Sequence, residues 1–299
     1  MSKVLCVGIA TLDHVFAVDE MPRGPEKFRA HGLAVVGGGT AGNAAYAVAK
    51  LGGAALLATR LGDDPTGDAI LAELEGAGVD CSLTLCLAGH RSPLSAIIVD
   101  EKGERLVICY SDPSLPQDAA HLPRELPPDV GAVLADVSFI AGAKPLLSAA
   151  RAKGLPGVID GDRVVDDDPA YFDLASHVAY SAATLRALTG VNDLARALRE
   201  LAHRAQSFLA VTDGARGTWF TESGKVAHEP AFPVEVRDTL GAGDVFHGAF
   251  ALALAEGMAE RRAVRFANAA AALKCTRFGG GRAGAPSRAE VEALLRGGE

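Results

Sequence analysis

The stretch DTLGAGDVF, residues 238–246, decides the fold, because it joins a β-rich run to a long apolar run. Two of its glycines, Gly241 and Gly243, allow a sharp turn and a close approach of another group to the backbone. The apolar run from Phe246 to Ala255 predicts a helix that begins at this turn. Since the first N–H groups of a helix lack intrahelical partners, residues 241–243 predict an anion site suited to phosphate.

The carboxylate of Asp244 is unusual beside such a turn, because it would repel a phosphate. One interpretation is that Asp244 caps the helix, since Asp is a favoured N-cap residue. The other is that Asp244 takes a proton from a hydroxyl group that attacks a phosphoryl group. The stretch alone leaves both interpretations open. His247, which follows on the helix, is expected to be a packed or hydrogen-bonded neighbour rather than a catalytic group.

Composition limits the class of protein. The 299 residues are 49% hydrophobic and include 34 glycines, enough for a large core with many tight turns. A net charge of -8 argues against nucleic-acid binding, which needs a basic face. The five cysteines form no Cys-x-x-Cys pair, which is typical of reduced thiols in a cytoplasmic protein. The apolar runs are too short to span a membrane, and the first of them predicts a strand rather than a signal peptide.

The order of predicted elements indicates an α/β fold. Strand and helix patterns alternate along most of the chain, which predicts a Rossmann-like, mostly parallel sheet flanked by helices. Two β-rich segments, 14–36 and 92–112, interrupt the alternation and are expected to pair as a small β-sheet lid. The core then consists of residues 1–13, 37–91 and 113–299.

The stretch GGGTAG, residues 37–42, matches the Gly-x-Gly-x-x-Gly pattern of dinucleotide sites, and Asp63 follows about twenty residues later. A dehydrogenase is therefore one alternative, although an earlier strand opens the sheet and glycine is abundant. A tight turn with close helix packing is the second. The third is a close approach of the backbone to a sugar, with Asn43 as donor and acceptor.

Three further groups of polar residues follow predicted strands, where ligands bind in α/β sheets. Asp13 can accept two hydroxyl hydrogen bonds from a sugar, or is a solvated turn residue. The stretch VTDGARG, residues 211–217, can hold phosphate through Thr212 and backbone N–H groups, or is an ordinary hairpin. Asp160 and Asp162 suit a hydrated Mg²⁺ ion, or belong to a solvated loop.

Together these residues resemble the ribokinase-like, or PfkB, family of carbohydrate kinases. The C-terminal signature is residues 238–248, and the N-terminal signature is GGGTAGNAA, residues 37–45, followed by RLGDDPTG, residues 60–67. Two signatures in this order, about 200 residues apart, shift each open alternative above toward a kinase. The resemblance covers essentially the whole chain and implies ATP and Mg²⁺ as cofactors.

The resemblance also implies roles for individual positions. It makes Asp244 the catalytic base, and the N–H groups of Gly241, Ala242 and Gly243 the anion hole. Substrate-binding positions are Asp13, Gly38, Gly39 and Asn43. Nucleotide-binding positions are Thr212, Asp213, Gly214, Gly217, Ser181 and, near the adenine, Asn268. Asp238 matches an acid that many members place beside a monovalent cation such as K⁺, with carbonyl groups from the loop around Arg277 and Gly279.

One departure concerns Mg²⁺. Many members carry Asn-x-x-Glu in a strand-to-helix turn, whereas residues 180–185 read YSAATL and contain no acid. We expect Asp160 or Asp162 to take its place, acting on the metal through water.

Within the family the chain is most similar to the 6-deoxy-6-sulfofructose kinases, through stretches such as DGD at 160–162 and ALKCTR at 272–277. These enzymes phosphorylate a ketohexose derivative at its primary hydroxyl group. Lys27 could reach a sulfonate from the lid, but Cys109 and Ser138 stand where stronger polar partners are expected. A neutral or differently charged sugar therefore stays open.

The sequence thus predicts an ATP-dependent kinase that phosphorylates a primary hydroxyl group of a small sugar, of ketohexose type. It predicts a homodimer formed through the β lid, with no nucleic acid or membrane as partner. A nucleoside kinase of the same fold and a non-catalytic sugar- or nucleotide-binding regulator are the alternatives.

Overall fold

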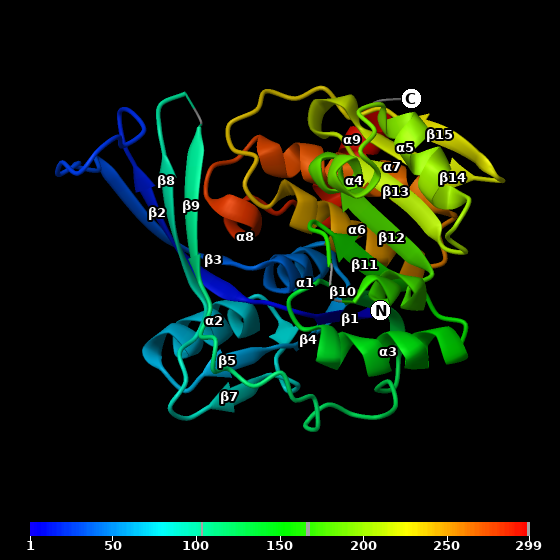
Figure 1. Ribbon diagram of the computed structural model, residues 1–299, viewed down its shortest axis with the longest axis horizontal. Helices are drawn as coiled ribbons and strands as arrows, with labels where there is room; N and C mark the ends of the chain where they lie inside the picture. The colour runs from blue at the N-terminus through cyan, green and yellow to red at the C-terminus, as the bar shows by residue number, and fades with distance from the viewer. Residues whose placement is uncertain (103, 166–167, 298–299) are drawn as a thin grey trace.

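The computed structural model describes residues 1–102, 104–165 and 168–297. In this part of the chain the alternating elements form a nine-stranded sheet that is parallel except at β14 and β15 (Figure 1). Across the sheet the strands follow the order β15 (Lys225–Glu229), β14 (Thr218–Glu222), β13 (Phe208–Thr212), β12 (His177–Ser181), β11 (Gly157–Gly161), β10 (Val130–Ala135), β1 (Lys3–Val7), β4 (Ala54–Ala58) and β6 (Val79–Asp80).

Both faces of this sheet are buried, because the central strands are apolar on both sides. Val4 and Cys6 of β1 belong to one hydrophobic cluster, whereas Leu5 and Val7 belong to the other. The first cluster includes residues of α1 (Thr40–Lys50), α2 (Pro65–Gly76), α6 (Ala242–Ala255), α7 (Glu260–Cys275) and α9 (Arg288–Gly297). The second includes residues of α3 (Ile140–Ala152), η1 (Pro169–Leu174), α4 (Ala182–Thr189) and α5 (Leu194–Ala202).

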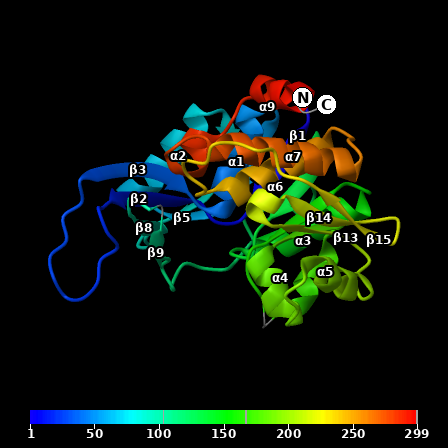
Figure 2. The same ribbon diagram turned by 90° about the horizontal axis from the view of Figure 1, so that it is seen from above.

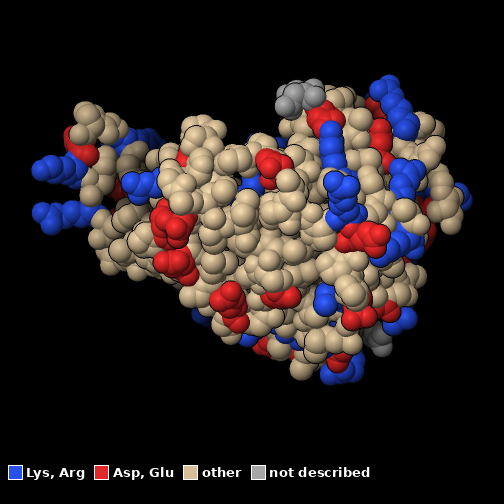
Figure 3. Space-filling view, turned by 90° about the horizontal axis from the view of Figure 1, so that it is seen from below, with Lys and Arg blue, Asp and Glu red and all other residues tan. Residues whose placement is uncertain are grey.

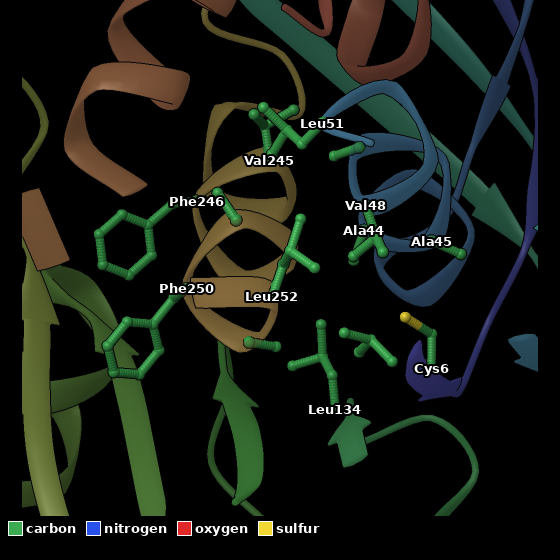
Figure 4. Packing of buried hydrophobic residues seen from close by; sticks show 14 of the residues in the cluster. Cys6, Ala44, Ala45, Val48, Leu51, Leu134, Val245, Phe246, Phe250 and Leu252 are labelled. Carbon is green, nitrogen blue, oxygen red and sulfur yellow. The ribbon is translucent and has the colours of Figure 1, made fainter. Parts of the chain in front are cut away.

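The central helix α6 is buried on all sides from Val245 to Leu254, since α1, α7 and the sheet surround it (Figure 4). Alanine-rich α1 packs closely on it. A Cβ atom at Gly248 would lie 2.5 Å from the carbonyl oxygen of Ala44, so this crossing needs a glycine. The close packing fixes the start of α6, and with it Asp244, relative to α1.

A second, four-stranded sheet stands beside the core (Figures 1 and 2). We call it the lid sheet; its order is β3 (Gly32–Gly38), β2 (Thr11–Ala17), β8 (Leu94–Val99) and β9 (Arg105–Tyr110). The remaining short elements are β5 (Arg60–Gly62) paired with β7 (Leu85–Leu87), the turn η2 (Gly214–Arg216) and the short helix α8 (Gly280–Gly284).

The predicted fold class is confirmed: a mostly parallel sheet lies between helices, and a small separate sheet accompanies it. Two predicted β runs differ: the run 55–61 divides into β4 and β5 at Thr59, and the β-rich run that precedes Asp238 forms no strand. The elements that were not predicted include the antiparallel strands β14 and β15 and the helices α7, α8 and α9. Among the described residues, no helix has the length and apolar character needed to cross a membrane.

Candidate active site

The site begins at the turn before α6. Gly241 has φ +77°, in the left-handed region that favours glycine, and it is the residue from which α6 starts. Asp244 lies in the first turn of α6, partly buried. Its Oδ2 accepts a hydrogen bond of 2.7 Å from Nδ2 of Asn43, a buried residue of α1. The turn and the start of α1, about 200 residues apart in the chain, therefore meet in the fold.

Asp244 and Asn43 line a cavity of about 590 Å³ between the lid sheet and the edge of the large sheet. Parallel strands β1 and β10 end at this edge, which is where α/β folds bind ligands. The predicted substrate residues Asp13, Gly39, Asn43, Cys109 and Ser138 line the same cavity.

Asp13 is buried on β2 and accepts a hydrogen bond of 2.8 Å from the hydroxyl group of Thr11. Burial raises the pKa of Asp13 above its usual value, while the hydroxyl groups of Thr11 and Ser95 act in the opposite direction. A Cβ atom at Gly38 would lie 2.0 Å from Oδ2 of Asp13, so glycine is required there for the carboxylate to lie against the backbone. These contacts hold Asp13 at the cavity wall.

Lys27 is the one predicted substrate residue that the structure leaves far from the cavity lining. It is exposed in the loop between β2 and β3, which projects from the far end of the lid sheet (Figure 2). Lys and Arg side chains extend at that same end in Figure 3. The loop points away from the core, so Lys27 does not join the other substrate residues.

Two arginines that were not singled out line the cavity instead, Arg60 and Arg163. The guanidinium group of Arg60 is buried against the ring of Phe139, and it donates to the carbonyl oxygens of Pro116 and Ser138 at 2.7 and 3.2 Å. Arg163 is exposed and donates to the carbonyl oxygen of Val137 at 2.8 Å. Arg60 lies two residues after the end of β4 and Arg163 two residues after the end of β11, so their positions just beyond strands of the large sheet could have pointed to them.

The pKa of Asp244 is raised to about 7, first by burial and then by the negative charge of Asp160. The hydrogen bond from Asn43 and the charge of His247 oppose this rise. A carboxylate with such a pKa takes up a proton readily near neutral pH, as a general base must.

His247 and Asp160 form a buried pair beneath Asp244. Nδ1 of His247 lies 3.0 Å from Oδ2 of Asp160 and 2.7 Å from the carbonyl oxygen of Gly243, and Nε2 lies 3.1 Å from the carbonyl oxygen of Ala179. Burial alone would lower the pKa of His247, but the charge of Asp160 and these acceptors raise it to about 9. The imidazolium therefore links the first turn of α6 to β11 and β12, as expected of a hydrogen-bonded neighbour.

Arg282 of α8 was not predicted, and it orients the Asn43 amide. Its buried guanidinium group donates to Oδ1 of Asn43 at 3.2 Å, to the carbonyl oxygen of Gly38 at 2.9 Å and to Glu73 at 2.5 Å. Because Oδ1 of Asn43 faces this cation, the amide NH₂ group faces Asp244. A Cβ atom at Gly37 would lie 1.9 Å from the guanidinium group, which explains a glycine there.

The predicted anion hole forms the start of α6. The N–H group of Ala242 donates to the carbonyl oxygen of Thr239 at 3.2 Å within the turn. Gly243 and Asp244 occupy the first turn, where backbone N–H groups have no acceptor within the helix. A Cβ atom at Gly241 would lie 2.4 Å from Cα of Gly281, so the turn packs directly on α8.

The predicted nucleotide residues gather at the ends of β12 and β13, next to β11 in the sheet. Thr212 ends β13, and Asp213 forms two hydrogen bonds with Arg216 in the following turn. Gly217 closes the turn at φ +90°, and Gly214 begins it. Since β11 lies between β12 and β10 in the sheet, these residues and the cavity at the end of β10 lie on opposite sides of the end of β11.

Two other nucleotide positions have protein partners. Ser181 caps α4, and its Oγ accepts from the N–H group of Thr184 at 3.1 Å. Asn268 is buried, with Oδ1 accepting from the hydroxyl group of Thr218 at 2.7 Å and Nδ2 donating to the carbonyl oxygen of Glu229 at 3.2 Å. Asn268 thereby fixes the ends of β14 and β15.

The acids predicted for Mg²⁺ differ in their surroundings. Oδ2 of Asp160 is paired with His247, while Oδ1 is buried without a partner. Asp162 is exposed, and burial of its carboxylate region together with the charge of Asp160 raises its pKa to about 6. Over residues 1–102, 104–165 and 168–297, no cluster of three or more His, Cys, Asp or Glu side chains could hold a metal ion by itself.

The monovalent cation implied beside Asp238 does not fit the residues present. Nζ of Lys274, a fully buried residue of α7, lies 2.8 Å from the carbonyl oxygen of Asp238 and 3.2 Å from Oδ2 of its carboxylate. An ammonium group already supplies the positive charge at this place.

A carboxylate with a pKa of about 7, an adjacent helix start and a polar cavity at the strand ends are the features expected of a phosphotransferase that acts on a hydroxyl group. Residues 1–288 match the pfkB family carbohydrate kinases, and the chain belongs to that family.

Individual relatives agree with this assignment. The chain is 30% identical to a ribokinase of Bacillus subtilis, over 99% of this chain and 100% of that protein. It is 30% identical to a fructokinase of Klebsiella pneumoniae, over 80% of this chain and 83% of that one. The crystal structure of a candidate ribokinase from Agrobacterium tumefaciens has a TM-score of 0.92 at 42% identity, covering 99% of this chain and 98% of the other. The protein is thus a sugar kinase of the ribokinase-like group.

Proposed function

We propose that this protein transfers the γ-phosphoryl group of ATP to a primary hydroxyl group of a small sugar of ketohexose type. The observation that carries the proposal is the pair of Asn43 and Asp244, 2.7 Å apart in the wall of a polar cavity that also contains Asp13. The relatives include both ribokinase and fructokinase, so the family leaves the sugar open.

In the proposed reaction, Asp13 and Asn43 hold hydroxyl groups of the sugar and turn the reacting one toward Asp244. A carboxylate oxygen of Asp244 takes the hydroxyl proton while the sugar oxygen bonds to the γ-phosphorus. The bond from the γ-phosphorus to its bridging oxygen breaks, and ADP leaves. N–H groups at the start of α6 stabilise the charge on the transferring group. Closure of the lid sheet would exclude water, which competes with the sugar for ATP.

For magnesium we propose Asp162, acting through water, as the replacement for the missing acid. The hydroxyl group of Thr184, at the place where many family members carry glutamate, donates to the carbonyl oxygen of Asp162 at 2.5 Å. Asp162 as a residue is exposed at this turn, although its carboxylate is partly desolvated, while Asp160 is engaged with His247. Mg²⁺ would supply charge neutralisation on the phosphates. Asp162→Ala should raise the Mg²⁺ concentration needed for half-maximal turnover, and an unchanged titration would contradict this role.

We also propose that the protein forms a homodimer through the outer face of the lid sheet. The strand register places Leu33, Phe16, Ile98 and Leu106 in one row on this face. The next row is Val35, His14, Ala96 and Ile108, in which Val35 and Ile108 are 52% and 58% exposed. A largely apolar sheet face of this kind marks an interaction site, and a two-fold axis would place it against its own copy.

The test is ADP release from ATP over a panel of fructose, ribose, 2-keto-3-deoxygluconate, 6-deoxy-6-sulfofructose, fructosamines and nucleosides. Asp244→Asn is the control, and we expect its turnover to be lower by about 10²- to 10⁴-fold, the usual contribution of a general base. Turnover of 6-deoxy-6-sulfofructose that falls in Arg163→Ala, with fructose unaffected, would indicate that the cavity recognises an anionic sugar.

The same panel addresses the alternatives. Among the described residues that line the cavity, Tyr110 is the one aromatic residue. Nucleobases stack on aromatic side chains, so this lining does not favour a nucleoside as substrate. A regulator without turnover would bind a sugar or ATP and give no ADP with any compound. The dehydrogenase alternative predicts a fluorescence change when NADH is mixed with the protein, and the kinase proposal predicts none.

A further inference from the structure

Lys274 of α7 holds a buried ammonium group beside the turn that precedes α6. Its side chain is 0% exposed, and Nζ contacts both the carbonyl oxygen and the carboxylate of one residue, Asp238, at 2.8 and 3.2 Å. Burial lowers the pKa of Lys274, and the charge of Asp238 opposes this. A lysine is rarely buried in this way unless an anion and acceptors compensate for the lost water.

Asp238 is the hub of the turn that precedes α6. Its carboxylate accepts hydrogen bonds from the N–H groups of Leu240 at 2.8 Å, Gly280 at 2.9 Å and Gly279 at 3.2 Å. Three backbone N–H groups and the ammonium of Lys274 therefore converge on one carboxylate. The contacts join the turn to the start of α8, and the ammonium neutralises the charge at their centre.

The contacts of Asp238 help to fix the positions of Asp244 and Asn43 in two ways. Along the chain, Asp238 fixes Leu240 and thereby the turn at Gly241, from which α6 and Asp244 start. Through α8, the contacts of Gly280 fix a helix whose Arg282 orients the Asn43 amide. Lys274 touches none of the reacting groups, so its role is positioning.

The surroundings are shaped for the lysine side chain. A Cβ atom at Gly284 would lie 2.9 Å from Cε and 3.2 Å from Cγ of Lys274, so the methylene groups pack directly on the backbone of α8. Nζ occupies the space between the carbonyl and carboxylate oxygens of Asp238, where a compact cation would otherwise bind. A metal ion at the same oxygens would have to displace a tethered ammonium group of the same charge.

We propose that Lys274 is the built-in cation of the turn before α6, so that this protein works without the monovalent metal ion that the fold family implies at Asp238. The part concerning turnover rests on the proposed function, whereas the part concerning the turn itself does not. Both parts predict that K⁺ leaves the natural protein unchanged and becomes effective only when the ammonium group is removed.

The first experiment uses the natural protein in KCl, NaCl and N-methyl-D-glucamine chloride at equal ionic strength. We expect the melting temperature to be the same in all three, and turnover of the best sugar to differ by less than about two-fold. A cation that binds the folded state must raise the melting temperature in proportion to its binding. A clear rise in KCl alone, or activation by K⁺ of about ten-fold, would overturn the proposal.

The second experiment removes the ammonium group in two ways. Lys274→Ala leaves space beside Asp238, so we expect a lower melting temperature and slower turnover that KCl restores and N-methyl-D-glucamine chloride does not. Lys274→Met fills the space without a charge, so we expect the same losses with no restoration by K⁺. Lys225→Ala, at an exposed lysine, is the control and should show neither the losses nor a response to K⁺.

If K⁺ restores Lys274→Ala but not Lys274→Met, then the charge of Lys274 positions the turn, and not its packing alone. Equal losses in both variants whatever the salt, or a Lys274→Ala protein that matches the natural one without K⁺, would overturn the proposal. If no sugar is phosphorylated, the kinase proposal fails while the melting temperatures still test Lys274. If Lys274→Ala does not fold, the salt comparison on the natural protein decides.

Discussion

At the scale of single residues, the centre of the molecule is a set of charges that control one another. Asp244 faces Asn43 from α1, Asp160 and Asp162 from the end of β11, and His247 from its own helix. The two acids raise the pKa of Asp244, while the amide and the imidazolium lower it. The pKa of about 7 therefore results from burial together with neighbouring groups that shift it in opposite directions.

This arrangement predicts a pH dependence for the proposed reaction. Because Asp244 must be ionised to accept a proton, kcat/KM should rise with pH and level off above about 7. In His247→Gln the nearby positive charge is lost, so the rise should shift to higher pH. In Asp162→Asn a neighbouring negative charge is lost, so the rise of kcat/KM should shift to lower pH. Rate profiles of the three proteins measure this; shifts in the same direction would contradict the charge model.

The same charges set how stability depends on pH. The folded-state pKa of His247, about 9, lies above its ordinary value of 6.5, so its contribution is fully present below pH 6.5 and is lost as the pH rises through 9. The folded-state pKa of Asp244 is also raised, so ionising it between its ordinary value of 3.8 and about 7 costs stability. Both groups make the folded protein less stable as the pH rises.

Some of these residues could be predicted from the sequence and others could not. Asp244, Asn43 and Asp13 belong to short patterns in which residue type and position suffice to suggest a role. Arg282 acts on Asn43 across 239 positions of the chain, and Lys274 acts on Asp238 across 36. No local pattern reports such a contact, since it exists only once the helices have packed.

At the scale of elements, the short helix α8 is the element that is hardest to predict from the sequence. Three of its five residues are glycine, which disfavours a helix, so its pattern indicates a loop. In the structure this short helix lies against the turn before α6 and carries Arg282 toward α1. The strands β8 and β9, by contrast, match the predicted runs, because alternation and a hairpin loop mark them.

The contact between the turn and α8 gives a second prediction, made with a matched pair of glycines. Gly241→Ala places a Cβ atom 2.4 Å from Cα of Gly281 and at φ +77°, so it should lower stability by about 1–3 kcal/mol and turnover strongly. At Gly243 a Cβ atom would meet nothing within 4 Å, so Gly243→Ala should leave stability unchanged or slightly higher.

Urea unfolding of both variants and the natural protein measures the difference. If the two substitutions cost the same free energy of unfolding, then the turn and α8 do not depend on this close contact, and the described route from Asp238 to Asn43 through α8 loses its support.

At the scale of the whole molecule, the strand order explains why the cavity and the predicted nucleotide residues lie apart. The cavity lies at the ends of β1 and β10 together with the lid sheet, and the predicted nucleotide residues lie at the ends of β12 and β13. Alternating strands and helices sufficed to predict a mostly parallel sheet. Its order was not predictable, because β1 enters between β10 and β4 and the lid strands pair across large separations in the chain.

The two faces of the lid sheet lead to a prediction about the oligomeric state of the protein. Its inner face lines the cavity with Asp13 and Cys109, whereas its outer face exposes Val35 and Ile108. Val35→Glu with Ile108→Glu should convert the expected dimer into a monomer, because two charges per copy would face an apolar partner surface. A stable dimer buries about 1,200–2,000 Å² in total, which requires most of this sheet face.

Sedimentation velocity at micromolar concentration gives the answer. Leu188→Glu is the matched control, since Leu188 is an exposed apolar residue on α4, outside the lid sheet. We expect the natural protein and the control to sediment as dimers and the double variant as a monomer. A natural protein that is monomeric, or a double variant that stays dimeric, would remove the lid from the interface. Because the same strands line the cavity, the monomer should also show a higher KM for the sugar, with kcat changed less.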